Sequence, residues 1–427
     1  MKYAVVLIVF SFVLITSEVE GRFSIKSVLD LVSPSNPEIH RVRRIEDAYG
    51  DPAAVLDTVG LIEQHGYPAE QHNFTSDDGY NIVIFRMPGS PTSPPAKGKR
   101  MVFLQHGMMA SSDSWALMGP KTDLVFMLAD AGYDVWMGNI RGNTYCRSHT
   151  NLTTANKEFW NFSWHDIAIM DVSKAISYAL EHSGQKKLFY IGHSMGTTMS
   201  YVLLTQRPEY NDKMNLVVSL APTAFWKYPS NILYQLSVQF STMIKTVLMD
   251  GLGKYDLFPQ SKTTGMLVQL MCGNRSPMQS LCLTFFELGV GPGIEPLNIS
   301  ALAYLTQYFP AGVSGKTLYH FAQCLKAGYL RKYDHGREEN LIVYGTEIPP
   351  AYDMSTASAP IALIYSNTDA LSIPPNAIGL SKLFPNLATC EVVPAPVFNH
   401  MDFIVSRYAK ELVYNRILEL FTLYTKD

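Results

Sequence analysis

One pentapeptide limits the possible folds more than any other part of the 427-residue chain, namely Gly192-His193-Ser194-Met195-Gly196. The residues before it, Lys187 to Ile191, are mostly apolar and aromatic and predict a buried strand, whereas Thr197 to Gln206 contain neither glycine nor proline and predict a helix. A serine between two glycines at a strand-to-helix turn is typical of a nucleophile on a strained backbone. The glycines are needed because a side chain at either position would collide with the turned backbone. The sequence therefore predicts a nucleophilic serine at Ser194.

The predicted elements on both sides of this turn alternate between strands and helices. The predicted strands are Met101 to Gln105, Tyr133 to Met137, Lys187 to Ile191, Asn215 to Leu220, Ile361 to Tyr365 and Thr389 to Val393, and the predicted helices are Thr122 to Ala131, a capping-box helix from Ser163 to before Gly184, and Lys410 to Thr422. Two further β-prone runs flank Asp78-Gly79 and predict an antiparallel hairpin. Buried strands that alternate with helices predict an α/β fold with a mostly parallel sheet and helices on both faces.

The pattern changes in the middle of the chain. Between Pro222 and Pro360 aromatic residues and methionines are frequent, and short helical patterns replace the alternation of strands with helices. A segment of this length is too long for a structureless loop in a compact domain. We therefore expect a core in two parts, residues 45–222 and 360–427, with a helical cap or lid inserted at residues 223–359. The alternative is that the middle segment is an ordinary extension of the core.

The amino-terminal residues predict entry into the secretory pathway. Lys2 precedes the apolar run Ala4 to Ile15, and small or polar residues follow as far as Gly21. The run is too short to span a bilayer, so we interpret residues 1–21 as a signal peptide, with a short membrane anchor as the alternative. No later stretch is long and apolar enough to span a bilayer. We therefore expect a secreted or lysosomal protein without a transmembrane segment.

A basic cluster, Arg41-Val42-Arg43-Arg44, lies in a polar stretch that contains proline. Such a cluster predicts a processing site that would free Ile45, in which case residues 22–44 are a propeptide. A solvated run of charges on an extended lead-in is the alternative.

The secretory pathway would also allow glycosylation and disulfide formation. The candidate glycan sites are Asn73, Asn151, Asn161 and Asn298, whereas Asn274 is weaker because Pro277 follows its sequon. The five cysteines are an odd number, so at least one is unpaired within the chain. Cys272 and Cys282 suit a small surface loop closed by a disulfide. We expect Cys146, Cys324 and Cys390 to be single buried thiols.

Composition argues against two classes of partner. The formal net charge is −3, and the chain has neither a basic stripe nor an acidic tail, so we do not expect nucleic acid binding. No Cys-x-x-Cys motif or His/Cys cluster has the spacing of metal ligands. We therefore expect no metal and no cofactor.

A serine hydroxyl is a weak nucleophile and needs a base and an orienting acid. In an α/β-hydrolase both follow the serine in the chain, first the acid and then the histidine, and each comes after a core strand. Asp369 follows the predicted strand Ile361 to Tyr365. His400 follows Thr389 to Val393 and is the only histidine downstream of Asp369. We therefore predict Ser194, Asp369 and His400 as nucleophile, acid and base.

Other acids and histidines fit these roles less well. Asp166 and Asp171 are rivals only by proximity in sequence, because both fall on the predicted helix before Lys187 to Ile191, the strand that leads into the turn, or elbow, at Ser194 (the elbow strand). His193 would point away from the serine hydroxyl, and His106 lies near the loop that leaves the predicted strand Met101 to Gln105. His320 and His335 lie in the middle segment, where a solvated or hydrogen-bonded histidine is the ordinary expectation.

Acyl transfer also needs hydrogen-bond donors for the oxyanion that develops in the transition state. The backbone N–H of Met195, directly after the serine, is one predicted donor. The second should come from the loop that leaves an early strand, and Gln105-His106-Gly107-Met108 occupies that place. Gly107 allows a tight turn, which makes the Met108 N–H the second predicted donor. A plain turn at the strand end is the alternative.

Several motifs along the chain resemble the acid lipase family of gastric and lysosomal lipases and their insect relatives. They are Leu104-Gln105-His106-Gly107, Gly138-Asn139-Ile140-Arg141-Gly142-Asn143, Glu158-Phe159-Trp160, Gly192-His193-Ser194 and Asn399-His400-Met401-Asp402-Phe403. They occur in the order of the family, and the resemblance extends from about Ile45 to the carboxyl terminus. It implies the α/β-hydrolase fold and the same triad and oxyanion residues. It also implies a Cys272–Cys282 disulfide, because vertebrate members have a similar bridge in the cap.

The resemblance implies hydrolysis of carboxylic esters, above all acylglycerols or steryl esters, beneath a cap and lid at a lipid–water interface. Vertebrate members usually carry glutamine after the serine and leucine after His-Gly, where this chain has Met195 and Met108. A backbone donor survives a change of side chain, so the departure concerns acyl-chain preference rather than catalysis. A soluble short-chain esterase is the nearer alternative. A lipid-carrying protein on a non-catalytic hydrolase scaffold is the more remote one.

Overall fold

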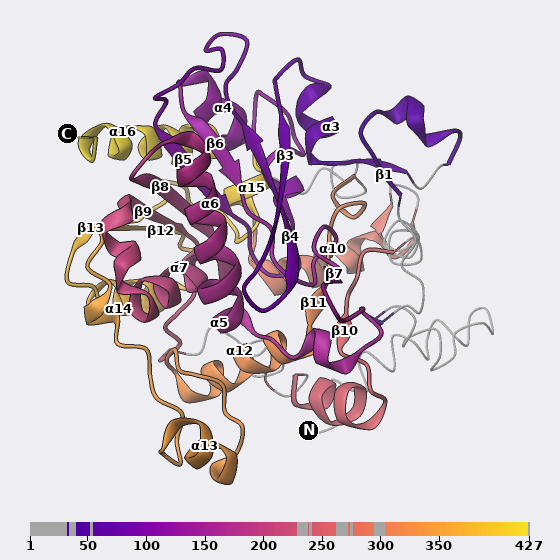
Figure 1. Cartoon of the computed structure of the whole chain (residues 1–427), viewed down its shortest axis with the longest axis vertical. Coiled ribbons are helices and arrows are strands. Elements are labelled where there is room, and N and C mark those ends of the chain that lie inside the picture. The colour runs from indigo at the N-terminus through magenta and orange to yellow at the C-terminus, as the bar shows by residue number, and fades with distance from the viewer. Residues whose placement is uncertain are drawn as a thin grey trace.

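A nine-stranded sheet forms the centre of the computed structural model, which describes residues 32–33, 40–51, 54–228, 238, 241–261, 272–273, 276–293 and 304–425 (Figure 1). The strand order is β13-β12-β9-β8-β5-β6-β4-β3, and β7 pairs with β4. The strands are β3 (Glu70–Thr75), β4 (Tyr80–Met87), β5 (Met101–Gln105), β6 (Asp134–Met137), β7 (Ser148–His149), β8 (Leu188–His193), β9 (Met214–Leu220), β12 (Ile361–Tyr365) and β13 (Leu387–Val392). From β13 to β6 they run parallel, and β4 and β3 complete the edge as an antiparallel hairpin. The predicted parallel sheet and the predicted hairpin are both confirmed.

Helices cover both faces of this sheet because successive residues of its strands point in opposite directions. In β8, Leu188 and Tyr190 belong to one buried apolar cluster, whereas Phe189 and Ile191 belong to another. Helices α6 (Ser173–Ser183) and α7 (Met195–Gln206) pack in the first cluster, and α4 (Leu124–Asp130) and α16 (Asn415–Leu423) in the second. All six residues of β8 are buried. A strand buried on both faces is what the continuous apolar run before Ser194 predicts.

The helix before the elbow strand begins and ends at the residues that the sequence indicates. Ser163 and Asp166 form a capping box at α5 (Trp164–Asp166), and Gly184 ends α6 in the left-handed conformation with φ of 66°. Between them lies a π-helical segment, η4 (Ile167–Val172), which the sequence does not predict. A π turn adds one residue to a turn of helix, and apolar periodicity is too coarse to register it.

The described residues between β9 and β12 form helices and a two-stranded ribbon, and none of their strands joins the central sheet. Apart from a short 3-10 helix directly before β12, the described elements are η6 (Ile244–Gly251), β10 (Asp256–Leu257), α10 (Gln279–Val290), β11 (Val313–Ser314), α12 (Gly315–Ala327) and α13 (Arg337–Tyr344). Helix α13 projects from the body of the molecule below α12 (Figure 1). This arrangement is compatible with an inserted cap, which stays a prediction. Within the described ranges, no helix has the length and apolar character needed to cross a membrane.

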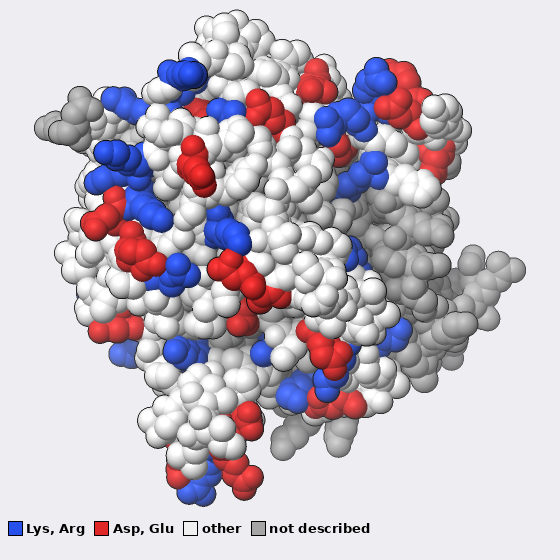
Figure 2. All heavy atoms as spheres, in the orientation of Figure 1, with Lys and Arg blue, Asp and Glu red and all other residues white. Residues whose placement is uncertain are grey.

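Shorter elements connect these layers. They are β1 (Arg41–Val42), η1 (Ile45–Ala48), β2 (Val55–Leu56), α3 (Thr58–Glu63), η2 (Ser112–Trp115), η3 (Lys157–Trp160), η5 (Pro208–Lys213), η7 (Met354–Thr356), α14 (Pro374–Ser381), α15 (Asp402–Val405) and η8 (Lys410–Tyr414). The predicted signal peptide, most of residues 22–44 and the sequon at Asn298 lie outside the described residues. On the face drawn in Figure 2, basic and acidic side chains are interspersed rather than gathered by sign.

Candidate active site

The predicted nucleophile, Ser194, lies on a strained turn between β8 and α7. Its φ is 53° and its ψ is −119°, in a region that side chains rarely allow. A Cβ atom on Gly192 would lie 2.6 Å from the carbonyl carbon of Gly196, and one on Gly196 would collide with the Gln105 carbonyl oxygen. Both glycines are therefore required by close backbone contacts, as the sequence indicates. A Cβ on Gly107 would lie 3.1 Å from the Ser194 Cβ, so the predicted oxyanion loop runs directly beside the serine.

Asp369 and His400 form a buried pair at the carboxyl ends of β12 and β13. His400 Nδ1 lies 2.8 Å from Asp369 Oδ2, and the two side chains are 5% and 0% exposed. The other carboxylate oxygen accepts hydrogen bonds from the backbone N–H groups of Leu371 at 2.7 Å and Ser372 at 2.9 Å. Burial by itself would raise the pKa of Asp369, but His400 and these donors outweigh it and lower the pKa below its ordinary value. The carboxylate is thus ionised and fixed in orientation.

His193 supports the backbone of the predicted base. Its Nε2 donates a hydrogen bond to the His400 carbonyl oxygen at 2.9 Å, and the two rings lie 4.9 Å apart. Burial, reinforced by His400, lowers the pKa of His193 to about 3, so this ring is neutral. Among the described residues no hydrogen bond joins Ser194 to His400. Hydrogen bonds between nucleophile and base are often long when no substrate is bound. The absence of this bond therefore does not argue against Ser194 and His400 acting together.

The rival acids have other partners. Asp171 is fully buried, and Arg141 donates to it through the guanidinium, at 2.6 Å from Nη2, and through the backbone N–H at 3.2 Å. Asp166 accepts a hydrogen bond from the Ser163 N–H at 2.8 Å as part of the capping box. Both carboxylates stabilise the helix layer, which leaves Asp369 as the acid that contacts a histidine at this edge of the sheet.

The predicted oxyanion loop is held by His106. With its Nδ1 donating to the Gly107 carbonyl oxygen at 2.8 Å, the ring can accept at Nε2 from Asn143 Nδ2 at 3.4 Å. Burial lowers the pKa of His106 to about 4, which keeps the ring neutral for both contacts. The carbonyl of Gly107 and the N–H of Met108 belong to one trans peptide and point in opposite directions. Anchoring the carbonyl therefore aims the Met108 N–H away from His106.

Both predicted oxyanion donors are open, and their side chains pack elsewhere. Within the described ranges, no hydrogen-bond acceptor contacts the N–H of Met108 or of Met195. The Met195 side chain is 1% exposed and lies in the cluster beneath α7. The Met108 side chain is half-buried and packs both against that cluster and against the cluster around η6 of the middle segment.

Helix α10 of the middle segment ends on the loops that carry the acid and the base. The Val290 carbonyl oxygen accepts hydrogen bonds from the N–H groups of His400 at 3.0 Å and Ala370 at 3.3 Å. Gly291 follows, and a Cβ there would collide with the Thr368 carbonyl oxygen. The same helix carries Cys282, whose disulfide with Cys272 is confirmed, with Cα atoms 5.4 Å apart. The sequence does not predict this contact, since nothing in α10 marks it as a neighbour of His400.

The remaining cysteines and the described sequons follow expectation in part. Cys146 and Cys324 are buried free thiols as predicted, whereas Cys390 is only half-buried. Three of the four candidate glycan sites, Asn73, Asn151 and Asn161, are exposed. Exposure is required for glycosylation, so these three stay candidates.

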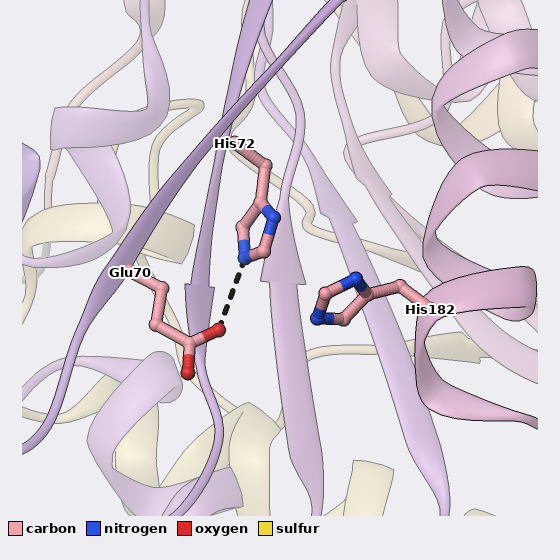
Figure 3. A group of neighbouring side chains, drawn as sticks. All are labelled: Glu70, His72 and His182. Carbon is pink, nitrogen blue, oxygen red and sulfur yellow. Dashed lines mark hydrogen bonds and ion pairs between the residues drawn. The ribbon is translucent and has the colours of Figure 1, made fainter.

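One group of side chains has the composition of a metal site. Glu70 and His72 on β3 and His182 on α6 offer ligand atoms within 4.8 Å of one another, although 110 residues separate the two histidines in sequence (Figure 3). Glu70 Oε2, however, already accepts from His72 Nε2 at 3.0 Å and from Arg86 Nη1 at 3.0 Å. A cation at this carboxylate would meet the Arg86 guanidinium. The group is therefore best described as an ion-pair network at the sheet edge.

A carboxylate that contacts a buried histidine, together with a serine on a strained strand-to-helix turn of the same mostly parallel sheet, is typical of serine hydrolases of the α/β-hydrolase fold. Comparisons with known proteins agree. Residues 58–119 match the family described as partial alpha/beta-hydrolase lipase region, and residues 100–248 match the alpha/beta hydrolase fold. A solved structure from Sulfolobus solfataricus shares this fold with a TM-score of 0.52, at 13% identity over 83% of this chain and 99% of that one.

Curated relatives narrow the class to lipases. Lipase 3 of Drosophila melanogaster is 37% identical over 86% of this chain and 92% of its own length. Gastric triacylglycerol lipase of Bos taurus is 33% identical over 87% of this chain and 92% of its own length. The chain belongs to this lipase family of α/β-hydrolases, and it is a carboxylic ester hydrolase. The resemblance drawn from its motifs is confirmed.

Proposed function

We propose that Ser194, Asp369 and His400 carry out ester hydrolysis through an acyl-enzyme. His400 Nε2 accepts the Ser194 proton as Oγ attacks the ester carbonyl carbon, and the resulting oxyanion is bound by the N–H groups of Met108 and Met195. The protonated His400 gives its proton to the leaving alcohol, and water then attacks the acyl-enzyme by the reverse sequence. The buried contact between His400 Nδ1 and Asp369 Oδ2 at 2.8 Å is the observation that carries the proposal. It orients the base and stabilises its protonated form.

The substrates we propose are acylglycerols or steryl esters at a lipid–water interface. The name of the Bos taurus relative refers to triacylglycerol, and the middle segment of this chain, proposed as a cap at residues 223–359, is rich in aromatic residues and methionines. Apolar side chains of this kind suit acyl chains or a sterol ring. Secretion after removal of residues 1–21, with glycans at the three exposed sequons and at Asn298, would bring the enzyme to extracellular or lysosomal lipid.

A fluorophosphonate probe tests the nucleophile. We expect the purified protein to react covalently, the Ser194→Ala variant not to react, and a variant of an exposed serine, Ser355→Ala, to react like the parent. Equal labelling of the Ser194→Ala variant would contradict the assignment.

Comparing substrates tests the substrate class. We expect turnover of emulsified triacylglycerol or cholesteryl oleate to exceed that of a soluble acetate ester. Activity confined to the soluble ester would favour the short-chain esterase, and binding of lipid without turnover would favour the lipid carrier.

A further inference from the structure

The segment before Ile45 is fastened to the core by a buried ion pair. Arg41 Nη2 lies 2.5 Å from Asp113 Oδ2, and the two side chains are 10% and 0% exposed. The guanidinium carbon lies 4.8 Å from the centre of the Tyr145 ring and 5.6 Å from that of Tyr308. A solvated run of charges therefore does not describe Arg41, and a protease could not reach it as an exposed processing site in this conformation.

Asp113 is the point at which several parts of the chain meet. It accepts hydrogen bonds from Thr58 Oγ1 at 2.6 Å, Ser111 Oγ at 2.9 Å and Tyr145 OH at 2.5 Å, in addition to the ion pair with Arg41. Arg41 is the one cation that contacts this carboxylate among the described residues. Without it a fully buried negative charge would remain uncompensated, which is strongly destabilising.

Asp113 also lies at the end of the loop that contains Met108, the proposed oxyanion donor. The loop runs from His106 through Met108 to Asp113. Asn139 Oδ1 accepts from the Ser112 N–H at 2.9 Å and from Asn143 Nδ2 at 2.8 Å, and Asn143 in turn contacts His106. The loop is thus held at His106 by Asn143 and at Asp113 by Arg41, with Met108 between the two attachments.

We propose that Arg41 is a positioning residue for ester hydrolysis, which keeps the Met108 N–H in place by neutralising Asp113 at the end of the same loop. The segment that begins at His40 then belongs to the working enzyme, and cleavage after Arg44 would lower turnover rather than activate the protein. The proposal rests on the function proposed above. The three arginines of the basic cluster therefore differ in role: Arg41 binds the core, whereas Arg43 and Arg44 are more exposed.

Matched arginine variants in the full-length protein test the proposal. We expect Arg41→Met to lower kcat by about tenfold to a hundredfold with KM changed less than about twofold, because a displaced oxyanion donor is felt in the transition state. The control is Arg43→Met, since Arg43 Nε lies 3.1 Å from Asp57 Oδ2 on a 41% exposed side chain. It should keep kcat within about a factor of two. Arg41→Lys should recover part of the loss.

A second variant covers the case in which Arg41→Met folds poorly. Combining Arg41→Met with Asp113→Asn removes the uncompensated charge, so we expect the pair to fold and to recover part of kcat. Amide hydrogen exchange over residues 106–113 gives a readout independent of activity, and it should be faster in Arg41→Met than in Arg43→Met. Unchanged kcat and exchange in Arg41→Met, or an equal loss in Arg43→Met, would overturn the proposal. If the parent itself showed no Ser194-dependent hydrolysis, the proposed function would fail, whereas the exchange measurement would still decide the role of Arg41.

Discussion

The Val290 carbonyl oxygen accepts a hydrogen bond from the backbone N–H of His400 at 3.0 Å. Through this bond the last turn of α10, which lies in the middle segment, contacts the residue that carries the proposed base. The Cys272–Cys282 disulfide fixes the other end of the same helix. Stability of the middle segment and geometry of the active site are therefore linked.

Removing the disulfide tests this link. In Cys272→Ser/Cys282→Ser we expect the free energy of unfolding to fall by about 2–3 kcal/mol, since the bridge closes a short loop, and kcat to fall as the support of His400 loosens. Cys390→Ser, which changes a half-buried free thiol, is the control and should alter neither quantity appreciably. Thermal unfolding without reductant and initial-rate kinetics measure the two effects. A loss of stability with full kcat would show that α10 does not support the base.

Substitutions of two buried aspartates should have different effects, one on catalysis and the other on stability. Asp369→Asn should lower kcat by about three to four orders of magnitude, because an amide neither holds the required tautomer of His400 nor stabilises its charged form. Asp171→Asn should instead lower the free energy of unfolding by about 3 kcal/mol, because Arg141 loses a buried partner. Kinetics and urea unfolding of both variants check this. A large kinetic loss in Asp171→Asn with native stability would revive Asp171 as the acid.

Buried neutral histidines should make stability depend on pH. The pKa of His193 is about 3 and that of His106 about 4 in the folded protein, below the ordinary 6.5. Below pH 6.5 the unfolded chain binds these protons and the folded protein does not, so stability is full above 6.5 and falls as the pH drops toward 4 and then 3. Each histidine contributes up to about 1.4 kcal/mol for each pH unit in its window.

The His193→Gln variant provides the test, because glutamine keeps a donor toward the His400 carbonyl but does not titrate. Urea midpoints measured from pH 4 to 8 should fall less steeply with acidification in the variant than in the parent. Parallel slopes would show that His193 is not the titrating group.

A methyl group at Gly196, in the turn that carries Ser194, should destabilise the protein. In Gly196→Ala the new Cβ would collide with the Gln105 carbonyl, so we expect loss of several kcal/mol of stability, or of soluble protein, together with activity. Gly289→Ala is the matched control, since a Cβ there meets nothing within 4 Å, and it should be neutral or slightly stabilising. Yield, thermal unfolding and probe labelling compare the two. Equal behaviour of the two variants would contradict the close approach at Gly196.

The strands and the order of the site residues could be predicted because both leave local signals. The predicted bounds of β5 and β12 are those of the structure, and Asp369 and His400 follow their strands as expected. What the sequence did not indicate are contacts between distant segments. The charge pattern around Arg41 gives no sign that its partner is Asp113, 72 residues away, and nothing local connects Asn139 and Asn143 to His106. Such partners are decided by packing in three dimensions, whereas strand and turn signals reside within a few residues.

Because the proposed oxyanion contacts come from the main chain, the side chains at positions 108 and 195 are free of any duty in the reaction. Met195 lies in the cluster beneath α7, and Met108 packs against both this cluster and the one around η6. We therefore expect substitutions at position 108, which is half-buried, to change the acyl groups that the enzyme accepts while the backbone donor is kept. Measuring the acyl-group preference of all substitutions at position 108 would test this expectation directly.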